Sequence, residues 1–154
     1  MYSNQAAFAE ISNHWLLKGS NMSHIIDKIA WIHVVDGHIL CARSHGKGTC
    51  YIPGGKREPG ESDHDTLIRE IEEELSVRIK PETISVYGTF EAEAHDKPEG
   101  VTVKMTCYYA DYEGEVSPSS EIEEVAWLSY KDRNRVSPVS RLIFDQLQRD
   151  KMLQ

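Results

Sequence analysis

Hydrophobic and polar positions alternate along several segments of the chain, and this pattern predicts a fold that is rich in β-strands. Residues 25–35 are rich in isoleucine, valine and tryptophan, as is typical of a central strand. Asp36 and Gly37 form a strong hairpin signal, so residues 38–43 are expected to return as a second strand. Further strands are predicted over residues 50–52, 77–79, 84–94, 101–112 and 125–128.

Two other segments show the spacing of amphipathic helices. In the first, Ser62 is the expected N-cap, with an aspartate three residues later. In the second, Ser137 is the expected N-cap and Pro138 takes the first helical position. Their apolar faces consist of Leu67, Ile68, Ile71 and Leu75 in the first helix and Val139, Leu142, Ile143 and Leu147 in the second. One early and one terminal helix among strands favour an α/β fold with a mixed sheet between helices.

The first 24 residues differ from the rest, and the domain is expected to span residues 25–154. A chain of 154 residues is long enough for one domain with its own core. Two interpretations of residues 1–24 stay open. They are a loosely held extension or an upstream translation start, or they form a short helix that packs on the domain or on a second subunit. The second interpretation would allow a homodimer.

Composition and charge exclude several classes of protein. The net charge of −8, from 17 basic and 25 acidic residues, argues against non-specific binding to a nucleic-acid polymer. The three cysteines are far apart and are expected to be reduced thiols in or near the core. No run approaches ~18 apolar residues, so no membrane span is expected. Because no secretory signal is visible either, the sequence predicts a cytoplasmic protein.

An acidic cluster on the first helix is the strongest chemical signal. Glu70, Glu73 and Glu74 stand at i, i+3 and i+4 and therefore share a helix face, whereas Glu72 points elsewhere. Like charges at this spacing destabilise a bare helix by roughly 0.2–0.5 kcal/mol per pair. A solvated acidic surface is one interpretation. The other is a site for Mg²⁺, or Mn²⁺ in its place, because hard cations prefer carboxylate oxygens.

The whole segment resembles the Nudix box, which favours the metal site. The residues that match the box are Gly55, Glu61, Arg69, Glu70, Ile71, Glu73, Glu74 and Val77. The one departure is Ser76, where the family has a glycine that closes the helix. The resemblance extends from about residue 25 to the C-terminal helix and implies a Nudix-type α/β/α sandwich with a mixed β-sheet. Ser76 is expected either to keep the left-handed conformation, at about 1 kcal/mol, or to end the helix differently.

The resemblance also implies an activity and the residues that carry it. Nudix proteins hydrolyse nucleoside diphosphates linked to another moiety, with water attacking a phosphorus atom and divalent metal ions on the phosphate oxygens. Glu73 and Glu74 match metal ligands, and Glu70 matches a further ligand or the base that activates water. Arg69 matches the residue that orients these glutamates, and Glu61 is its expected structural partner.

Residues outside the acidic cluster complete the expected site. The backbone carbonyl of Gly54 or Gly55 is a candidate metal ligand. Some branches of the family take the base from a loop, where Glu121 is favoured here over Glu124.

The expected substrate contacts are less specific. Arg43 and Lys56 match positions that are often basic in the family and are expected to bind substrate. Lys47 and Arg57 are interpreted as surface charges. Four aromatic side chains could stack on a base but are more often found in cores, namely Trp31, Phe90, Tyr108 and Trp127.

The substrate class is the least determined part of the expectation. Ala92 and Ala94 stand where the ADP-ribose and dinucleoside polyphosphate branches carry a proline and a tyrosine. The broad MutT-like group therefore remains as the default, with a nucleoside triphosphate or a nucleoside diphosphate derivative as substrate. The alternatives are an ADP-ribose or nucleotide-sugar pyrophosphatase, a non-catalytic module that senses a nucleotide, and an RNA 5′-end pyrophosphohydrolase.

Overall fold

The computed structural model describes residues 24–94 and 97–154. The interpretations of residues 1–24 fall outside this part of the chain, except for His24, which begins the first strand. The strands are β1 (His24–Trp31), β2 (Val34–Val35), β3 (His38–Ser44), β4 (Gly54–Gly55), β5 (Arg78–Ile79), β6 (Ser85–Glu93), β7 (Val101–Tyr109), β8 (Tyr112–Glu113) and β9 (Ile122–Leu128). The α-helices are α2 (Asp63–Leu75) and α3 (Pro138–Arg149), and the 3₁₀ helices are η1 (Pro81–Thr83) and η2 (Tyr130–Arg135).

The strands form three sheets. The largest has the order β4-β1-β7-β6, in which β1 and β7 are parallel and the other neighbours are antiparallel. The second has the order β2-β3-β9, and β5 pairs with β8 in the third. The expected mixed sheet is therefore confirmed, with β1 at its centre.

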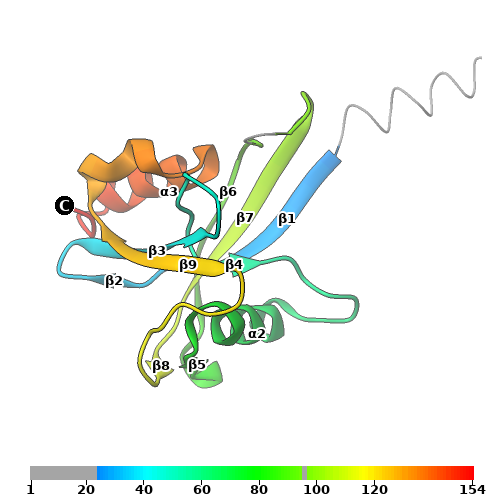
Figure 1. The fold of residues 1–154 in the computed structure, drawn as a ribbon, viewed down its shortest axis with the longest axis vertical. Coiled ribbons are helices and arrows are strands. Elements are labelled where there is room, and N and C mark those ends of the chain that lie inside the picture. Colours follow the sequence, from blue (N-terminus) through cyan, green and yellow to red (C-terminus); the bar gives the residue numbers. More distant parts are fainter. Residues whose placement is uncertain (1–23, 95–96) are drawn as a thin grey trace, which may run out of the picture.

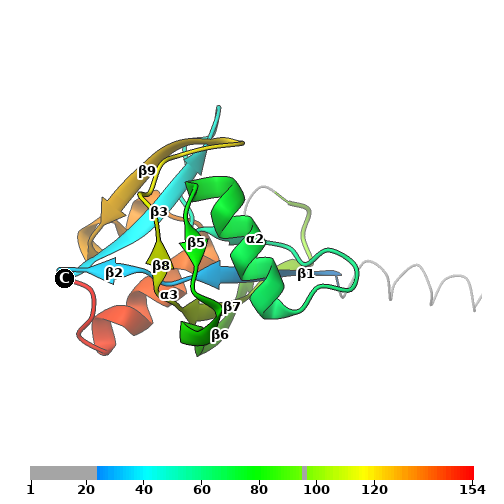
Figure 2. The ribbon, with the colours of Figure 1, turned by 90° about the horizontal axis from the view of Figure 1, so that it is seen from below.

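The two α-helices lie on opposite sides of the strands (Figure 1). In Figure 2, which views the molecule from below, α2 lies in front, with the β5–β8 pair beside it. This arrangement is the expected α/β/α sandwich. In the described part of the chain, no helix has the length and apolar character needed to cross a membrane.

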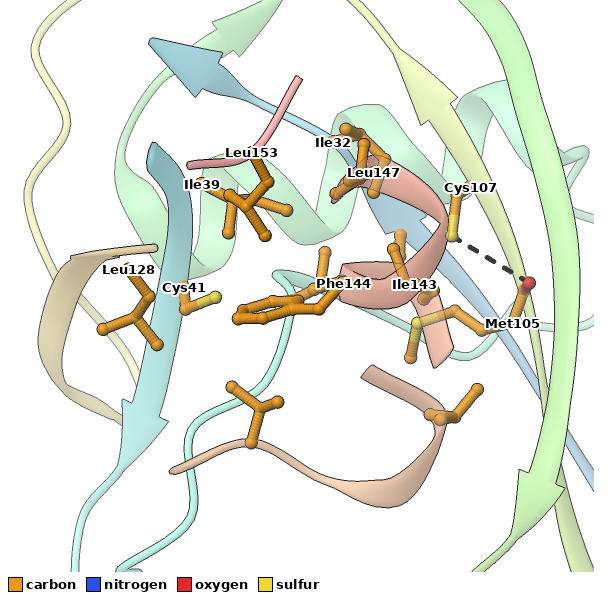
Figure 3. Packing of buried hydrophobic residues seen from close by; sticks show 14 of the residues in the cluster. Ile32, Ile39, Cys41, Met105, Cys107, Leu128, Ile143, Phe144, Leu147 and Leu153 are labelled. Atoms are coloured by element: carbon orange, nitrogen blue, oxygen red, sulfur yellow. Dashed lines mark hydrogen bonds between the residues drawn. The ribbon is translucent and has the colours of Figure 1, made fainter. Parts of the chain in front are cut away.

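Each helix covers a hydrophobic core of its own. On the α2 side, Leu67, Ile71 and Leu75 are fully buried against Ile29 and Trp31 of β1. On the α3 side, Phe144 lies at the centre of a cluster that includes Ile143 and Leu147 of the same helix (Figure 3). Strand β1 contributes to both cores because successive side chains point to opposite faces.

The three cysteines lie in the core, as expected. Cys41 and Cys107 are fully buried and Cys50 nearly so, and none forms a disulfide. Burial raises the pKa of all three thiols. In Figure 3 the Cys41 and Cys107 side chains lie on opposite sides of the α3-side core. These thiols therefore act as small apolar side chains.

The strand predictions were wrong where one segment serves two sheets. Residues 25–35 are not continuous, because β1 ends at Trp31 and the next two-residue strand pairs in another sheet. Residues 101–112 divide between β7 and β8 for the same reason. Residues 50–52 form only isolated bridges, from Tyr51 to Ala42 and from Cys50 to Val136, so they build no strand.

Candidate active site

Helix α2 begins at the predicted N-cap, and its C-terminal end takes one of the two forms that the sequence left open. The hydroxyl of Ser62 accepts a hydrogen bond from the amide of Asp65, which satisfies one of the free N–H groups of the first turn. Ser76 has φ of 62° and ψ of 24°, so it keeps the left-handed conformation in which glycine is usual. The helix is thereby fixed at both ends as well as along its buried face.

A short loop is fastened to the C-terminal end of α2. The amide of Ser119 donates to the carbonyl oxygen of Glu74, and its hydroxyl donates to the carbonyl oxygen of Glu73. The Ser76 hydroxyl donates in turn to the Ser119 hydroxyl at 3.2 Å. The loop that leads to Glu121 is therefore held by the same helix that carries the acidic cluster.

The two glycines of β4 approach the acidic cluster more closely than any other residue type could. A Cβ atom on Gly54 would lie 1.9 Å from the carbonyl oxygen of Ile29, and Gly54 has φ of 148°. A Cβ atom on Gly55 would lie 2.4 Å from the carboxyl carbon of Glu70. The amide of Gly54 donates to Oε1 of Glu74 at 3.3 Å. Gly54 is thus required by packing against the backbone of β1, whereas Gly55 leaves the space that the Glu70 carboxylate occupies.

Arg69 organises the carboxylates with most of its donors. Its Nε and Nη2 donate to the two oxygens of Glu61 at 2.7 and 2.9 Å, a bidentate pair. Its Nη1 donates to Oε1 of Glu70 at 2.9 Å and to Oε2 of Glu73 at 3.4 Å. Its Nη2 also donates to the carbonyl oxygen of Lys56. The Arg69 guanidinium holds the pKa of Glu61 well below its usual range, at about 2.

The three acids of the cluster differ in environment. Glu74 is 1% exposed, and its Oε2 has no hydrogen-bond partner within the described residues. Burial, with the neighbouring charge of Glu70, raises the pKa of Glu74 to about 9. Burial also raises the pKa of Glu70, against the opposing effect of Arg69. The side chain of Glu73 is 52% exposed.

The donor set fits a divalent cation. A buried carboxylate oxygen without a partner, next to a second carboxylate, is stabilised when a cation lies between them. Within the described residues, no group of three or more ligating side chains converges on one point. Glu70 and Glu74 are close to each other, whereas Glu73 would have to turn inward to join them.

The two loop glutamates considered as a base lie in different surroundings. Burial is the main cause of the raised pKa of Glu70 and Glu74, and the charge of Glu121 adds a smaller contribution to both. The carboxylate of Glu124 accepts hydrogen bonds from Arg43 instead, at 2.8 Å from Nη2. In the described part of the chain, Glu121 is therefore the loop acid that Arg43 does not bind.

A cavity of ≈ 420 Å³ opens beside Gly54. Its walls come from β1, β7, the loop after β3 and the first turn of α3. Of the basic residues singled out from the sequence, Lys47 lines the cavity, and Arg43 holds the adjacent loop by donating to the Lys47 carbonyl oxygen. Lys56 is exposed. Burial lowers the pKa of Lys28, another lining residue, and the charge of Lys56 lowers it further. The cavity lining in the described part of the chain includes none of the four aromatic residues.

Two residues that the sequence reasoning missed belong to this region. Lys28 lines the cavity from the middle of β1. Arg57, interpreted as a surface charge, bridges Asp27 of β1 at 3.1 Å and Asp63 of α2 at 2.6 Å. Tyr108 of β7 donates to the same Asp63. No local pattern could reveal these positions, because the partners of Arg57 and the cavity walls around Lys28 come from other elements.

Comparisons with known proteins agree with this geometry. Residues 27–147 match the family model described as the NUDIX domain. A human protein named 8-oxo-dGDP phosphatase NUDT18 is 40% identical over 43 residues, which are 28% of this chain and 13% of the human protein.

Solved structures share the fold. A MutT Nudix hydrolase from Burkholderia pseudomallei has a TM-score of 0.67 at 23% identity and covers 81% of this chain and 99% of its own. The MutT protein from Methanosarcina mazei Go1 has a TM-score of 0.64 at 19% identity, with coverages of 84% and 96%. A Nudix hydrolase from Nitrosomonas europaea has a TM-score of 0.65 at 16% identity, with coverages of 83% and 90%.

Proposed function

This chain belongs to the Nudix family of hydrolases, and we propose that it cleaves a diphosphate linkage in a nucleotide by attack of water on phosphorus. The substrate is a nucleoside triphosphate or a nucleoside diphosphate derivative, and the reaction depends on Mg²⁺, with Mn²⁺ as a substitute. The observation that carries the proposal is the buried carboxylate of Glu74, which lacks a partner on Oε2 and faces a second acid beside the β4 glycines.

The residues of α2 would hold the metal. Glu70, Glu73 and Glu74 supply carboxylate oxygens, and the carbonyl of Gly54 is a further ligand. A bound divalent ion would neutralise the phosphate charge and lower the pKa of a bound water. Arg69 keeps Glu70 in place through the hydrogen bond to Oε1 and is itself fixed by Glu61. The same guanidinium reaches Glu73, so one side chain positions two of the three acids.

Two carboxylates are candidates for the base that removes a proton from water. Glu70 has a raised pKa, which makes its carboxylate a stronger base near neutral pH. The charge of Glu121 acts on the cluster, and Arg43 pairs with Glu124 instead of Glu121. In either case a new P–O bond forms to the water oxygen, the anhydride P–O bond breaks, and the leaving phosphate departs.

The size of the cavity supports the proposed class of substrate. Its volume of ≈ 420 Å³ falls within the range of small-molecule sites and suits a nucleoside. The name of the human relative supports including 8-oxo-dGDP among the substrates tested. The net charge of −8 again speaks against a nucleic-acid polymer as partner. A nucleotide substrate and reduced core thiols agree with the expected cytoplasmic location.

A nucleotide panel tests the proposal. The purified chain is incubated with Mg²⁺ and nucleoside triphosphates, 8-oxo-dGDP, ADP-ribose and a nucleotide sugar, and the products are separated by chromatography. We expect Mg²⁺-dependent release of a nucleoside monophosphate with pyrophosphate or phosphate. Reaction in ¹⁸O-labelled water identifies the phosphorus that is attacked, because the label enters that product.

Variants then separate the roles of the acids. Glu73→Gln, alone or with Glu74→Gln, removes ligand charge at nearly constant shape and is expected to lower kcat about 10²-fold or more. Glu72→Gln is the matched control, since this acid is exposed on the same helix and away from the cluster. Comparison of Glu70→Gln with Glu121→Gln identifies the base. Hydrolysis at the wild-type rate by the double variant would refute the site, and tight nucleotide binding without turnover would favour a sensing module.

A further inference from the structure

Lys28 occupies an unusual place for a lysine. It lies in the middle of β1, which is itself an inner strand of the four-stranded sheet. Along this strand, Ile29 and Trp31 face the α2-side core, whereas Ala30 faces the α3-side core. Lys28 belongs to the second set and lines the cavity on the α3 side of the sheet. A strand position fixes its Cα atom more firmly than a loop position would.

The cavity carries positive charge in a strongly acidic molecule. Three lysines line it, namely Lys28, Lys47 and Lys97, against one acid, Glu93. The chain as a whole has a net charge of −8. Lys47 and Lys97 come from loops, so their positions can adapt to a ligand. The local excess of positive charge indicates that the group bound here is rich in negatively charged or acceptor oxygens.

Lys28 also lies at the junction between the cavity and the acidic cluster. Gly54 lines the cavity and donates its amide to Glu74, so the two sites share a boundary. The charges of Glu74 and Glu70 act on Lys28, as does the charge of Lys56. In the part of the chain that the structure describes, no hydrogen bond or ion pair joins the Lys28 ammonium group to an acceptor. A partly buried ammonium group without a partner is costly, so a ligand oxygen would stabilise it.

We propose that Lys28 binds one phosphate group of the scissile diphosphate, namely the one that is bonded to the part of the substrate held in the cavity. This inference rests on the proposed function, because it assumes that the diphosphate lies at the acidic cluster. A substrate with one end at Glu70 and Glu74 and the other in the cavity must pass the boundary at Gly54. Lys28 lines the cavity together with Gly54, the residue that forms this boundary. Lysine suits this position because its compact charge can bind one phosphate oxygen without the planar geometry of arginine.

Ligand binding without metal provides the test. Titration calorimetry in EDTA compares GMP with guanosine, and AMP with adenosine, so that each pair differs only by the phosphate. The variants are Lys28→Met, Lys28→Gln and Lys28→Arg. Lys104→Met is the matched control, because this lysine lies on the neighbouring strand, opposite Asp27, and does not line the cavity.

For the wild type we expect tighter binding of the monophosphate than of the nucleoside in at least one pair. Lys28→Met and Lys28→Gln are expected to weaken monophosphate binding at least tenfold and to leave nucleoside binding unchanged. Lys28→Arg is expected to restore part of the loss, and Lys104→Met to behave as wild type. In turnover assays Lys28→Met is expected to raise KM more than it lowers kcat.

Three results would overturn the inference. The first is equal binding of monophosphate and nucleoside by the wild type. The second is unchanged monophosphate binding by both neutral variants. The third is an equal loss for monophosphate and nucleoside, which would assign Lys28 to the base or sugar. None of these results depends on turnover, so a failure of hydrolysis in the nucleotide panel would count against the proposed function alone.

Discussion

At the scale of single residues, the proposed site depends on two glycines that let the β4 backbone approach Glu70 and strand β1 closely. Gly55 leaves room for the Glu70 carboxylate, and Gly54 lets β4 lie against Ile29 and Ala30 of β1. Arg69 then holds the acid from the other side. The position of Glu70 therefore depends on the missing side chain of Gly55 as much as on the hydrogen bond from Arg69.

Gly55→Ala is expected to inactivate the protein without unfolding it. The new methyl group would lie 2.4 Å from the carboxyl carbon of Glu70, and the flexible end of that side chain can move aside. Displacing the acid is expected to lower kcat about 10²-fold or more. Kinetics and thermal unfolding on the same sample check this.

Gly54→Ala is the informative comparison for that variant. There the methyl group would meet the backbone of Ile29, which cannot move alone, so this variant is expected to lose stability as well. A Gly55→Ala protein with full activity would show that Glu70 does not need its present position.

Motif residues and their partners could be predicted from the sequence because their contacts are short in range. The pairing of Arg69 with Glu61 and its contacts with Glu70 and Glu73 were implied by the match to the Nudix box, whose residues lie on one helix and its lead-in loop. Lys28 could not be predicted in this way. Its role depends on which face of β1 looks into the cavity, and this is set by the packing of α2 and α3 on opposite sides.

At the scale of elements, α2 is suited to carry the proposed site because both its ends and its buried face are fixed. The N-cap and the leucine and isoleucine stripe were predicted from local patterns, whereas the left-handed conformation of Ser76 was one of two helix ends left open. The irregular position, Ser76, leaves the helix end unchanged. It also makes a contact with Ser119 that a glycine could not make.

Ser76→Gly is expected to change stability slightly and activity not at all. Relief of the left-handed conformation should stabilise the protein by about 1 kcal/mol. Loss of the hydroxyl contact with Ser119, which is exposed, should offset part of this gain. Urea unfolding measures the difference, with turnover as the second readout. A large loss of turnover would mean that the Ser76–Ser119 contact positions the loop that carries Glu121.

The elements that sequence patterns missed are those defined by distant partners. Strand β4 has two residues and exists only because Gly54 and Gly55 pair with β1. Residues 25–35 are likewise divided between two sheets, and no local pattern marks the division. Only the pairing partner changes, from β7 for β1 to β3 for β2. Periodicity reports which side of a strand is buried, but the choice of sheet is made by contacts between remote segments.

At the scale of the whole molecule, the acidic cluster is expected to influence stability as well as the proposed chemistry. The pKa of Glu74 is raised from its ordinary value to about 9 by burial and by Glu70. The stabilising effect of the protonated acid is therefore complete below the pKa of the unfolded chain, about 4.3. It is lost as the pH rises toward the pKa of the folded protein. Without metal, the folded state is thus at a disadvantage in alkaline solution.

Metal-free protein is expected to lose thermal stability from about pH 5 to about pH 9. Glu74→Gln removes the titrating group, so the curve of this variant should be flatter than that of the wild type in EDTA. Added Mg²⁺ should raise the Tm of the wild type most at the alkaline end of this window and leave the variant almost unchanged. Parallel curves for the two proteins in EDTA would contradict the assignment of the buried acid.

The buried thiols make the molecule suitable for single-site chemical labelling. Cys41, Cys50 and Cys107 are the only cysteines in the chain, and burial keeps each thiol protonated and out of reach. A reagent that attacks thiolates should therefore leave the natural chain unmodified. One cysteine introduced on the exposed surface could then carry a fluorophore or spin probe, with no need to replace the natural cysteines. The signal of that probe would then report on the domain while its core stays intact.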